Sequence, residues 1–246
     1  MFFGTLNLKK IGRLVFKCEI FLAVIVIAAT FVGALVKLPF EALPASAPPV
    51  SERIVILDAG HGGEDSGAIG VSGVLEKDLN LSIVKTLGEM LEDEGVKVIY
   101  TRLEDKLLYK PEEDIKGIRK ISDLKNRCKI AAEYPEALFV SIHMNSFGTE
   151  KYSGLQVYSS ADEESLGLAG FIQRSVVELI QPDNKRKVKE GKDIYILENT
   201  ENTAVLIECG FLSNPDECAR LADENYRAAL AAVLCDSIRD YIFKNH

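Results

Sequence analysis

The fold of this chain is decided by the stretch Ile54-Val55-Ile56-Leu57-Asp58-Ala59-Gly60-His61-Gly62-Gly63-Glu64-Asp65-Ser66-Gly67-Ala68. Its four leading apolar residues, three of them β-branched, are typical of a short buried strand. The glycines that follow allow the backbone to turn sharply or to pass close to a ligand. Because open α/β sheets bind ligands outside the carboxyl ends of their strands, His61 in this loop is a candidate functional residue. The alternative is a tight turn that carries an incidental histidine.

Apolar runs of strand type alternate with amphipathic helical segments along residues 53–246. A strand, a helix and a second strand in that order indicate a parallel crossover unit. The segment therefore predicts one α/β domain with a mostly parallel sheet flanked by helices. We expect strands at residues 54–57, 96–101, 138–142, 154–159, 194–197 and 204–207. We expect helices from an N-cap at Asp78 to a stop at Gly95, and at residues 123–133, 165–180 and 225–243, with long loops at 102–122 and 181–193.

The N-terminus is set apart from this domain by its composition. Residues 20–36 carry no charge and follow a basic stretch, so residues 1–37 are predicted to be a signal or anchor segment. The basic residues place the N-terminus in the cytoplasm, which puts the body of the protein outside it, membrane-anchored or secreted. Ala45-Ser46-Ala47 resembles a small-residue cleavage site, but Pro48 and Pro49 follow it directly, which favours a retained anchor. A buried core helix is the alternative for residues 20–36. Residues 38–52 are rich in proline and predict an extended linker.

Charge and cysteine usage exclude several classes of protein. The formal net charge is −8, and residues 1–47 are basic, so the remaining domain is more acidic still. Such a domain lacks the electrostatic footprint of a nucleic-acid-binding protein. The five cysteines form no C-x-x-C pair, which argues against a disulfide scaffold and a zinc ribbon. We expect buried thiols that act as small apolar groups instead.

Three of the predicted strands end in a polar side chain, namely His61, His143 and Glu208. Since parallel strands share one carboxyl edge, these side chains are expected to converge. Glu76 lies just before the first predicted helix, on the loop that leaves the same edge. Two imidazoles and a carboxylate are a common ligand set of catalytic zinc, and a further carboxylate can act as base and acid. A glutamate that follows four apolar residues, as Glu208 does, is costly to bury without a partner, which favours a functional role.

Five motifs in the domain resemble one known family. They are Asp58-Ala-Gly-His-Gly-Gly63, Glu76-Lys-Asp-Leu-Asn-Leu81, Thr101-Arg102, Ser141-Ile-His-Met-Asn145 and Leu206-Ile-Glu-Cys-Gly-Phe-Leu-Ser-Asn214. From about Ile54 to the C-terminus, the chain is similar to the zinc-dependent N-acetylmuramoyl-L-alanine amidases of bacterial cell walls. The regions 108–127 and 193–202 look most like the spore-cortex, germination-specific branch of that family.

The resemblance implies a ligand set, a reaction and a substrate. His61, Glu76 and His143 would bind Zn²⁺, and Glu208 would be the catalytic carboxylate. The reaction would be hydrolysis of the amide bond between N-acetylmuramic acid and L-alanine in peptidoglycan, in spore-cortex maturation. The sequence does not indicate whether a protein activator is needed.

Several further residues have two candidate roles. Asp58 could orient His61 or cap the turn. Asn145 could hold substrate or satisfy the loop backbone. Arg102 and Arg127 could pair with carboxylates of the peptide stem, the alternative being ordinary ion pairs between elements.

Other features carry less weight. Ala59 and Met144 depart from the family, which usually has proline and a small residue there, but neither change removes a ligand. Cys209 is expected to pack behind its strand, and the basic run 185–189 to be a solvated surface.

Three other functions stay open: a zinc exopeptidase with the same ligands, a non-catalytic wall-binding module and a membrane-tethered structural protein. The lack of tryptophan counts against a sugar-stacking platform.

Overall fold

The computed structural model of the chain describes residues 53–110, 112, 115 and 118–245. The predicted anchor at residues 1–37 and the predicted linker at 38–52 lie outside the described residues, so both stay predictions. Within the described residues, no helix combines the length and the apolar character needed to cross a bilayer.

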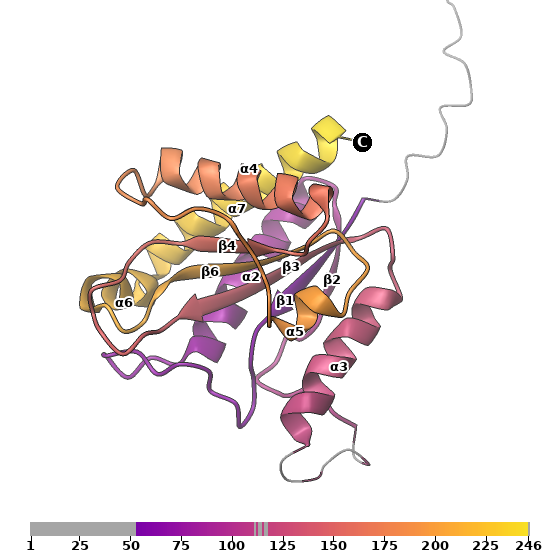
Figure 1. Cartoon of the computed structure of the whole chain (residues 1–246), viewed down its shortest axis with the longest axis horizontal. Helices are drawn as coiled ribbons and strands as arrows, with labels where there is room; N and C mark the ends of the chain where they lie inside the picture. Colours follow the sequence, from indigo (N-terminus) through magenta and orange to yellow (C-terminus); the bar gives the residue numbers. More distant parts are fainter. Residues whose placement is uncertain (1–52, 111, 113–114, 116–117, 246) are drawn as a thin grey trace, which may run out of the picture. The chain divides into compact units, whose positions relative to one another are not determined.

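A six-stranded, mostly parallel sheet forms the centre of the domain, which confirms the predicted α/β class (Figure 1). The strands in spatial order are β2 (Lys97–Tyr100), β1 (Ile54–Ala59), β3 (Leu138–Asn145), β6 (Ala204–Phe211), β4 (Gln156–Ser159) and β5 (Lys189–Glu190). The first four are parallel, whereas β4 is antiparallel to β6 and β5 is parallel to β4. Apolar residues dominate β1, β3 and β6 because both faces of these strands are covered.

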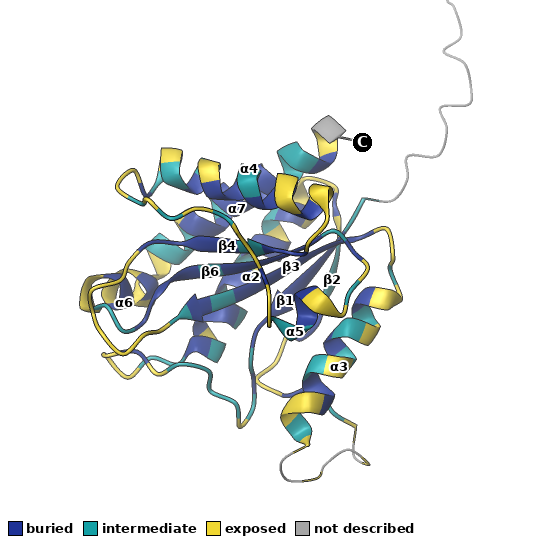
Figure 2. Ribbon diagram, viewed as in Figure 1, coloured by how far each residue is buried: buried dark blue, intermediate teal, exposed yellow. Residues whose placement is uncertain are grey.

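Helices cover the two faces of the sheet and bury two apolar clusters. They are α2 (Glu76–Asp93), α3 (Arg119–Ala132), α4 (Glu163–Leu179), α5 (Tyr195–Glu198), α6 (Pro215–Ala222) and α7 (Glu224–Asn245). The larger cluster lies between the sheet and α2, α4 and α7, and the smaller one between the sheet and α3 and α5. Figure 2 shows that β1, β3, β6 and β4 are mostly buried, while the edge strands β2 and β5 and the outer sides of the helices are more exposed.

The helix α2 begins at Glu76, so the predicted cap at Asp78 is wrong. Leu75 occupies the N-cap position, and its side chain makes no capping hydrogen bond. The preceding loop supplies the acceptor instead, because Glu76 N donates to Ala68 O at 3.0 Å. The loop after β1 is thus folded against the start of α2, which brings Glu76 to the edge of the sheet.

The predicted strand at residues 194–197 is wrong, because Tyr195–Glu198 form the short helix α5 and Ile194 is its N-cap. A short apolar run does not distinguish a strand from a buried helix by its periodicity. Here Glu198 N donates to Ile194 O in a helical hydrogen bond, and β5 already occupies the edge of the sheet beside β4. Ile196 and Leu197 are buried in the smaller cluster. The strand β5 itself lies in the predicted loop at 181–193.

Two helix starts also differ from the sequence prediction. The helix α6 was not predicted, although Asn214 accepts a capping hydrogen bond from Glu217 N at 3.1 Å and Pro215 opens the first turn. An N-cap asparagine and a proline in the first turn are ordinary signals of a helix start. They were not recognised here because they follow the end of β6 within four residues. The helix α3 begins at Arg119, four residues before the predicted start at Asp123.

The strand order creates a topological switch point between β1 and β3. The chain leaves β1 to reach β2 on one side and later forms β3 on the other side of β1. At such a point the connections diverge and open a crevice at the carboxyl edge of the sheet. His61 follows β1 and His143 lies near the end of β3, so both predicted histidines flank this crevice.

Candidate active site

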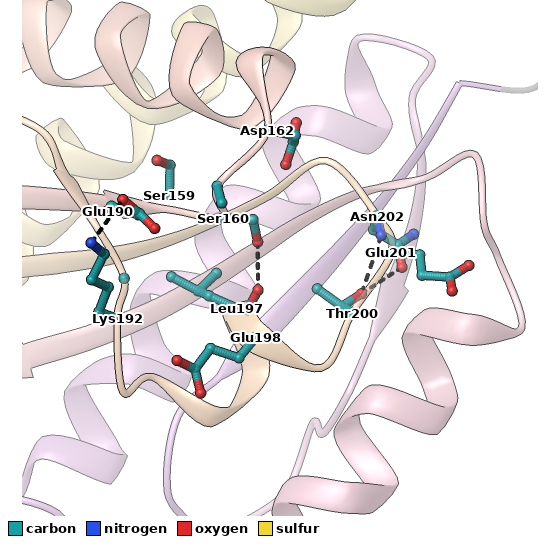
Figure 3. A pocket seen from close by; sticks show the side chains of 12 residues that line it. Ser159, Ser160, Asp162, Glu190, Lys192, Leu197, Glu198, Thr200, Glu201 and Asn202 are labelled. Atoms are coloured by element: carbon teal, nitrogen blue, oxygen red, sulfur yellow. Dashed lines mark hydrogen bonds and ion pairs between the residues drawn. The ribbon is translucent and has the colours of Figure 1, made fainter.

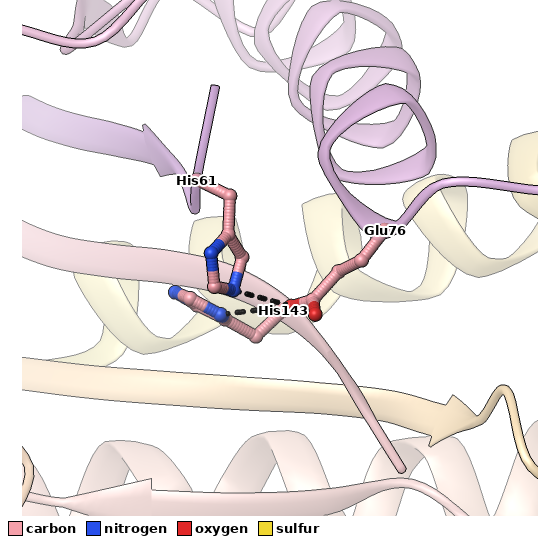
Figure 4. A group of neighbouring side chains, drawn as sticks. All are labelled: His61, Glu76 and His143. Atoms are coloured by element: carbon pink, nitrogen blue, oxygen red, sulfur yellow. Dashed lines mark hydrogen bonds and ion pairs between the residues drawn. The ribbon is translucent and has the colours of Figure 1, made fainter. Parts of the chain in front are cut away.

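Three side chains from different elements meet at the carboxyl edge of β1 and β3 (Figure 4). His61 comes from the loop after β1, His143 from β3, and Glu76 from the first turn of α2. One ligand atom of each lies within 4.8 Å of the others. Nitrogen and carboxylate donors at this spacing suit a single divalent metal ion. The structure therefore brings together the three residues that the family resemblance implies as metal ligands.

Glu76 is the shared partner of both imidazoles. Its Oε1 lies 3.1 Å from His61 Nε2 and 3.0 Å from His143 Nδ1. The backbone N–H groups of Met144 and Ala68 donate to its Oε1 and Oε2 at 3.0 Å and 2.8 Å. Burial alone would raise the pKa of Glu76, but His143 and His61 hold that pKa below its usual value. The carboxylate is therefore charged and held in one position.

Close backbone approach shapes the loop that carries His61. A Cβ atom at Gly60 would lie 2.2 Å from the His143 ring, and one at Gly67 would lie 2.5 Å from Glu76 Oε2. Gly67 has a φ of 63°, a backbone conformation that favours glycine. His61 has a φ of 61°, which is uncommon for a residue with a side chain. The surrounding hydrogen bonds must therefore hold His61 in this conformation.

Asp65 orients the ring of His61. Its Oδ2 accepts the Nδ1–H of His61 at 2.9 Å, an assignment made from the hydrogen-bond partners, and Nε2 then faces Glu76. Burial acts to lower the pKa of His61, but Asp65 and Glu76 outweigh it and raise the pKa to about 9. Lys120 lies 3.2 Å from the same oxygen of Asp65. The sequence prediction missed Asp65, whose one signal was its position four residues after His61 in the glycine loop.

Asp58 takes neither of its predicted roles. It is fully buried, and Arg127, Thr101 Oγ1 at 2.7 Å and Ser141 Oγ at 2.5 Å all donate to its carboxylate. Burial acts to raise the pKa of Asp58, but Arg127 and the two hydroxyls lower the pKa below its usual value. Asp58 is thus a buried, charged anchor beneath the loop rather than a partner of His61.

Arg127 and Arg102 are buried as well, with exposed fractions of 1% and 2%. Arg127 pairs with Asp58 and Asp123, and both arginines donate to the carbonyl oxygen of Ala59 at 2.8 Å. Both guanidinium groups therefore hold backbone at the end of β1. This placement supports the structural alternative for both arginines, although Arg127 also lines a small hollow beside His61 and His143.

Glu208 lies beside the His–Glu group on the neighbouring strand. It is the register partner of His143 in the β3–β6 pair, so the two side chains share one face of the sheet. Its Oε2 is buried and makes no hydrogen bond with the described residues. Burial raises the pKa of Glu208 to about 7, while His143 acts in the opposite direction. A carboxyl group that titrates near neutral pH is suited to proton transfer.

Two other residues from the sequence analysis lie close by. Cys209 is buried in the larger cluster, behind the strand as predicted, and so on the face opposite Glu208. Asn145 ends β3, and its carbonyl oxygen accepts from Leu212 N at 2.8 Å. A contact between the Asn145 side chain and substrate stays a prediction.

A larger cavity of ≈ 550 Å³ lies elsewhere, at residues from β4, β5, α5 and the adjoining loops (Figure 3). Its charged lining residues are Asp162, Glu190, Lys192, Glu198 and Glu201. It contains no histidine and none of the four predicted site residues. A smaller hollow is lined by His61, His143 and Asp65 among others. We place the active site at the smaller hollow because its donor groups converge, whereas size alone indicates no chemistry.

The fold and the site together define an α/β domain with a candidate metal centre at a topological switch point. The chain belongs to the N-acetylmuramoyl-L-alanine amidase family, which residues 55–240 match. It is therefore a hydrolase of the amide class. This assignment confirms the resemblance seen in the motifs and decides against an exopeptidase, a non-catalytic module and a purely structural protein.

Similar proteins cover nearly the whole domain. The germination-specific N-acetylmuramoyl-L-alanine amidase of Bacillus subtilis (strain 168) is 36% identical over 196 residues, which are 78% of this chain and 81% of the relative. The CwlD amidase of Clostridioides difficile, solved in complex with the GerS lipoprotein, is 40% identical with a TM-score of 0.75, covering 78% of this chain and 99% of that one. The catalytic domain of CwlV from Bacillus (Paenibacillus) polymyxa var. colistinus is 30% identical with a TM-score of 0.65, covering 78% and 98%.

Arg127→Met is expected to lower the free energy of unfolding by about 3–5 kcal/mol, because it leaves the buried Asp58 without its counter-charge. Urea unfolding at pH 7 measures this. The pKa of Asp58 is lower in the folded than in the unfolded state, so its contribution is present above about pH 4. That contribution is lost as the pH falls through the folded-state pKa of Asp58. The difference in the free energy of unfolding between wild type and Arg127→Met should therefore become smaller at low pH.

The matched control is Lys125→Met, which removes an exposed charge from the same helix. It should change the free energy of unfolding by less than about 0.5 kcal/mol. Equal stability of Arg127→Met and wild type at pH 7 would show that the buried pair does not stabilise the folded domain.

Proposed function

We propose that this chain is a zinc-dependent amidase that hydrolyses the bond between N-acetylmuramic acid and L-alanine in peptidoglycan. His61, Glu76 and His143 would hold the metal, and Glu208 would be the catalytic carboxylate. The observation that supports this proposal most directly is that three ligand atoms lie within 4.8 Å of one another. Beside them, the buried Oε2 of Glu208 has no hydrogen-bond partner among the described residues. When bound, zinc supplies a Lewis acid that activates water and polarises the amide carbonyl.

The donor set fits zinc in both its inner and its supporting contacts. Two imidazole nitrogens and one carboxylate oxygen are typical of catalytic zinc sites, which keep one further position for water or substrate. Metal-binding histidines usually donate their other ring N–H to a carboxylate, and His61 does so to Asp65 at 2.9 Å. Backbone N–H groups of Met144 and Ala68 donate to the Glu76 carboxylate and so fix its position.

Glu208 is placed to move the protons that amide hydrolysis requires. The attacking water must lose a proton, and the departing L-alanine nitrogen must gain one. Burial raises the pKa of Glu208 to about 7, so the carboxyl group can accept a proton and release it at neutral pH. Oε2 is the candidate atom for accepting and donating this proton, since no residue that the structure describes forms a hydrogen bond with it.

The spore cortex is the proposed site of action. The germination-specific amidase of Bacillus subtilis and the CwlD amidase of Clostridioides difficile are 36% and 40% identical to this chain. Peptidoglycan lies outside the cytoplasmic membrane, so the predicted signal or anchor at residues 1–37 would carry the domain to its substrate.

Cortex fragments are expected to lose their peptides at the lactyl carbonyl when incubated with the full chain and zinc. Mass spectrometry should detect glycan with free muramic acid and peptides that begin with L-alanine, and a chelator should stop their release. Fragments of vegetative wall serve as the comparison. Faster cleavage of vegetative than of cortex fragments would contradict the cortex role, and intact amide bonds in both would contradict the amidase function.

Asp65→Ala is expected to weaken zinc binding about 10–100-fold, because the His61 ring loses the carboxylate that orients it. Competition with a chromogenic chelator measures the affinity without any turnover. Lys120→Gln is the control, since it removes the ion pair with Asp65 and leaves the Asp65–His61 hydrogen bond in place. Unchanged affinity in Asp65→Ala would exclude its orienting role.

Glu208→Gln is expected to keep zinc at the wild-type stoichiometry and to lower kcat by about 10²–10⁴-fold. The reason is that the glutamine side chain cannot accept a proton and return it as a carboxylate can. Metal content by atomic absorption and product release by mass spectrometry give the two values. Glu178→Gln removes an exposed carboxylate from α4 and should leave both unchanged. Wild-type turnover in Glu208→Gln would refute the catalytic role.

A further inference from the structure

We infer that Arg186 forms a carboxylate-binding subsite for the peptide on the L-alanine side of the cleaved bond. This inference rests on the proposed function and adds a specificity determinant to it. Arg186 lies in the connection between α4 and β5, a region whose basic run the sequence analysis interpreted as a solvated surface. Lys185, Lys187 and Lys189 are exposed as expected, whereas the Arg186 guanidinium lies at the carboxyl edge of β6, beside Phe211.

A row of three side chains leads from the active site toward Arg186. His143 in β3, Glu208 in β6 and Gln156 in β4 are register partners across three adjacent strands. Direct cross-strand partners share a face, and neighbouring strands are about 5 Å apart. Gln156 therefore continues the line of His143 and Glu208 by one strand, on the same face of the sheet.

Arg186 is bound to the end of this row in a fixed orientation. Its Nη1 donates to Gln156 Oε1 at 2.8 Å and its Nε to Ser153 O at 2.8 Å. Gln156 is buried, and its Nε2 donates to Lys187 O at 2.8 Å, which fixes the direction of its amide. The guanidinium carbon also lies 4.3 Å from the ring centroid of Phe211, the last residue of β6. A guanidinium held on three sides loses little conformational freedom when it binds a ligand.

Tyr158 lies beside the same groups. Burial raises the pKa of its hydroxyl, Glu208 raises it further, and Arg186 lowers it. Tyr158 is therefore close enough to both charged groups to be influenced by each. Its hydroxyl lies 3.4 Å from Gln156 Oε1, the atom that also accepts from Arg186.

The positive charge of Arg186 is not neutralised by the domain. Its hydrogen bonds to the described residues use Nε and Nη1 and reach uncharged oxygens, and it forms no ion pair with a described carboxylate. Arg127, by contrast, is paired with Asp58 and Asp123. A half-buried guanidinium with a free N–H edge binds a carboxylate strongly, because both partners are charged and their geometries match.

The chemistry of the substrate places its carboxylate on the peptide side. The lactyl carboxyl group of muramic acid is consumed in the amide bond, so the glycan next to that bond carries no charge. The peptide that leaves with L-alanine carries free carboxylates, and an extended chain advances about 3.5 Å per residue. A carboxylate on the residue after L-alanine is thus within reach of a guanidinium one strand beyond Glu208.

Two synthetic muramoyl peptides test this inference, and they differ in one group. Both contain N-acetylmuramoyl-L-alanine followed by one residue, which bears either a free carboxylate or the corresponding carboxamide. The full chain loaded with zinc should cleave the carboxylate peptide with a kcat/KM about 10–100-fold higher. Arg186→Gln should abolish that preference, chiefly through a raised KM, while its kcat/KM for the carboxamide stays within about 3-fold of wild type.

Matched variants separate binding from structure. Lys185→Gln removes an exposed charge one residue away and should keep the wild-type preference. Arg186→Lys should restore part of it, since lysine keeps the charge but lacks the planar fork. Equal cleavage of both peptides by wild type overturns the inference and leaves the amidase function standing. An equal loss on both peptides in Arg186→Gln assigns Arg186 a structural role and also overturns it.

Failure of the proposed function is distinguished by a binding measurement. If wild type cleaves neither peptide, titration calorimetry of the same protein with both peptides decides the subsite without turnover. Tighter binding of the carboxylate peptide that is lost in Arg186→Gln supports the subsite. Equal binding of the two peptides overturns it.

Discussion

The buried ion pair between Asp58 and Arg127 is the interaction on which the rest of the site depends. Asp58 ends the apolar part of β1, and Arg127 reaches it from α3 on one face of the sheet. The same guanidinium donates to the carbonyl oxygens of Ala59 and His61 at 2.8 Å. The charge pair thus also satisfies backbone groups of the loop that holds His61 in its uncommon left-handed conformation. Such a pair is costly to bury, and its value here is the fixed position of a loop rather than stability alone.

On this support, the candidate metal site is assembled from three elements that the switch point brings together. Glu76 enters from the start of α2 because the preceding loop, rather than a side-chain cap, accepts its first backbone hydrogen bond. Glycines at positions 60 and 67 let the loop approach His143 and Glu76 more closely than any side chain would permit. The geometry of the donor side chains therefore follows from backbone contacts of the loop after β1 and the first turn of α2.

The same sheet edge joins the proposed chemistry to the proposed recognition of substrate. His143, Glu208 and Gln156 are register partners, so the strand pairing that positions the proposed catalytic carboxylate of Glu208 also positions Gln156, the anchor of Arg186. The antiparallel strand β4 provides this continuation on the side away from β1. A single rigid sheet would thus set the separation between the cleaved amide and the carboxylate of the departing peptide.

The sequence by itself determined the fold class and the candidate ligands, because these depend on local patterns: apolar strands, glycine loops and motifs with characteristic residues. It also predicted the convergence of His61, His143 and Glu208, since parallel strands share one edge. Only the tertiary structure decided that Asp65 rather than Asp58 orients His61, that residues 194–197 are helical, and that Arg102 and Arg127 are buried. These outcomes depend on which distant segments pack together and what they leave unpaired, and no local pattern encodes that. The charge of Arg186 is visible in the sequence, whereas its place beside Gln156 arises only when β4 pairs with β6.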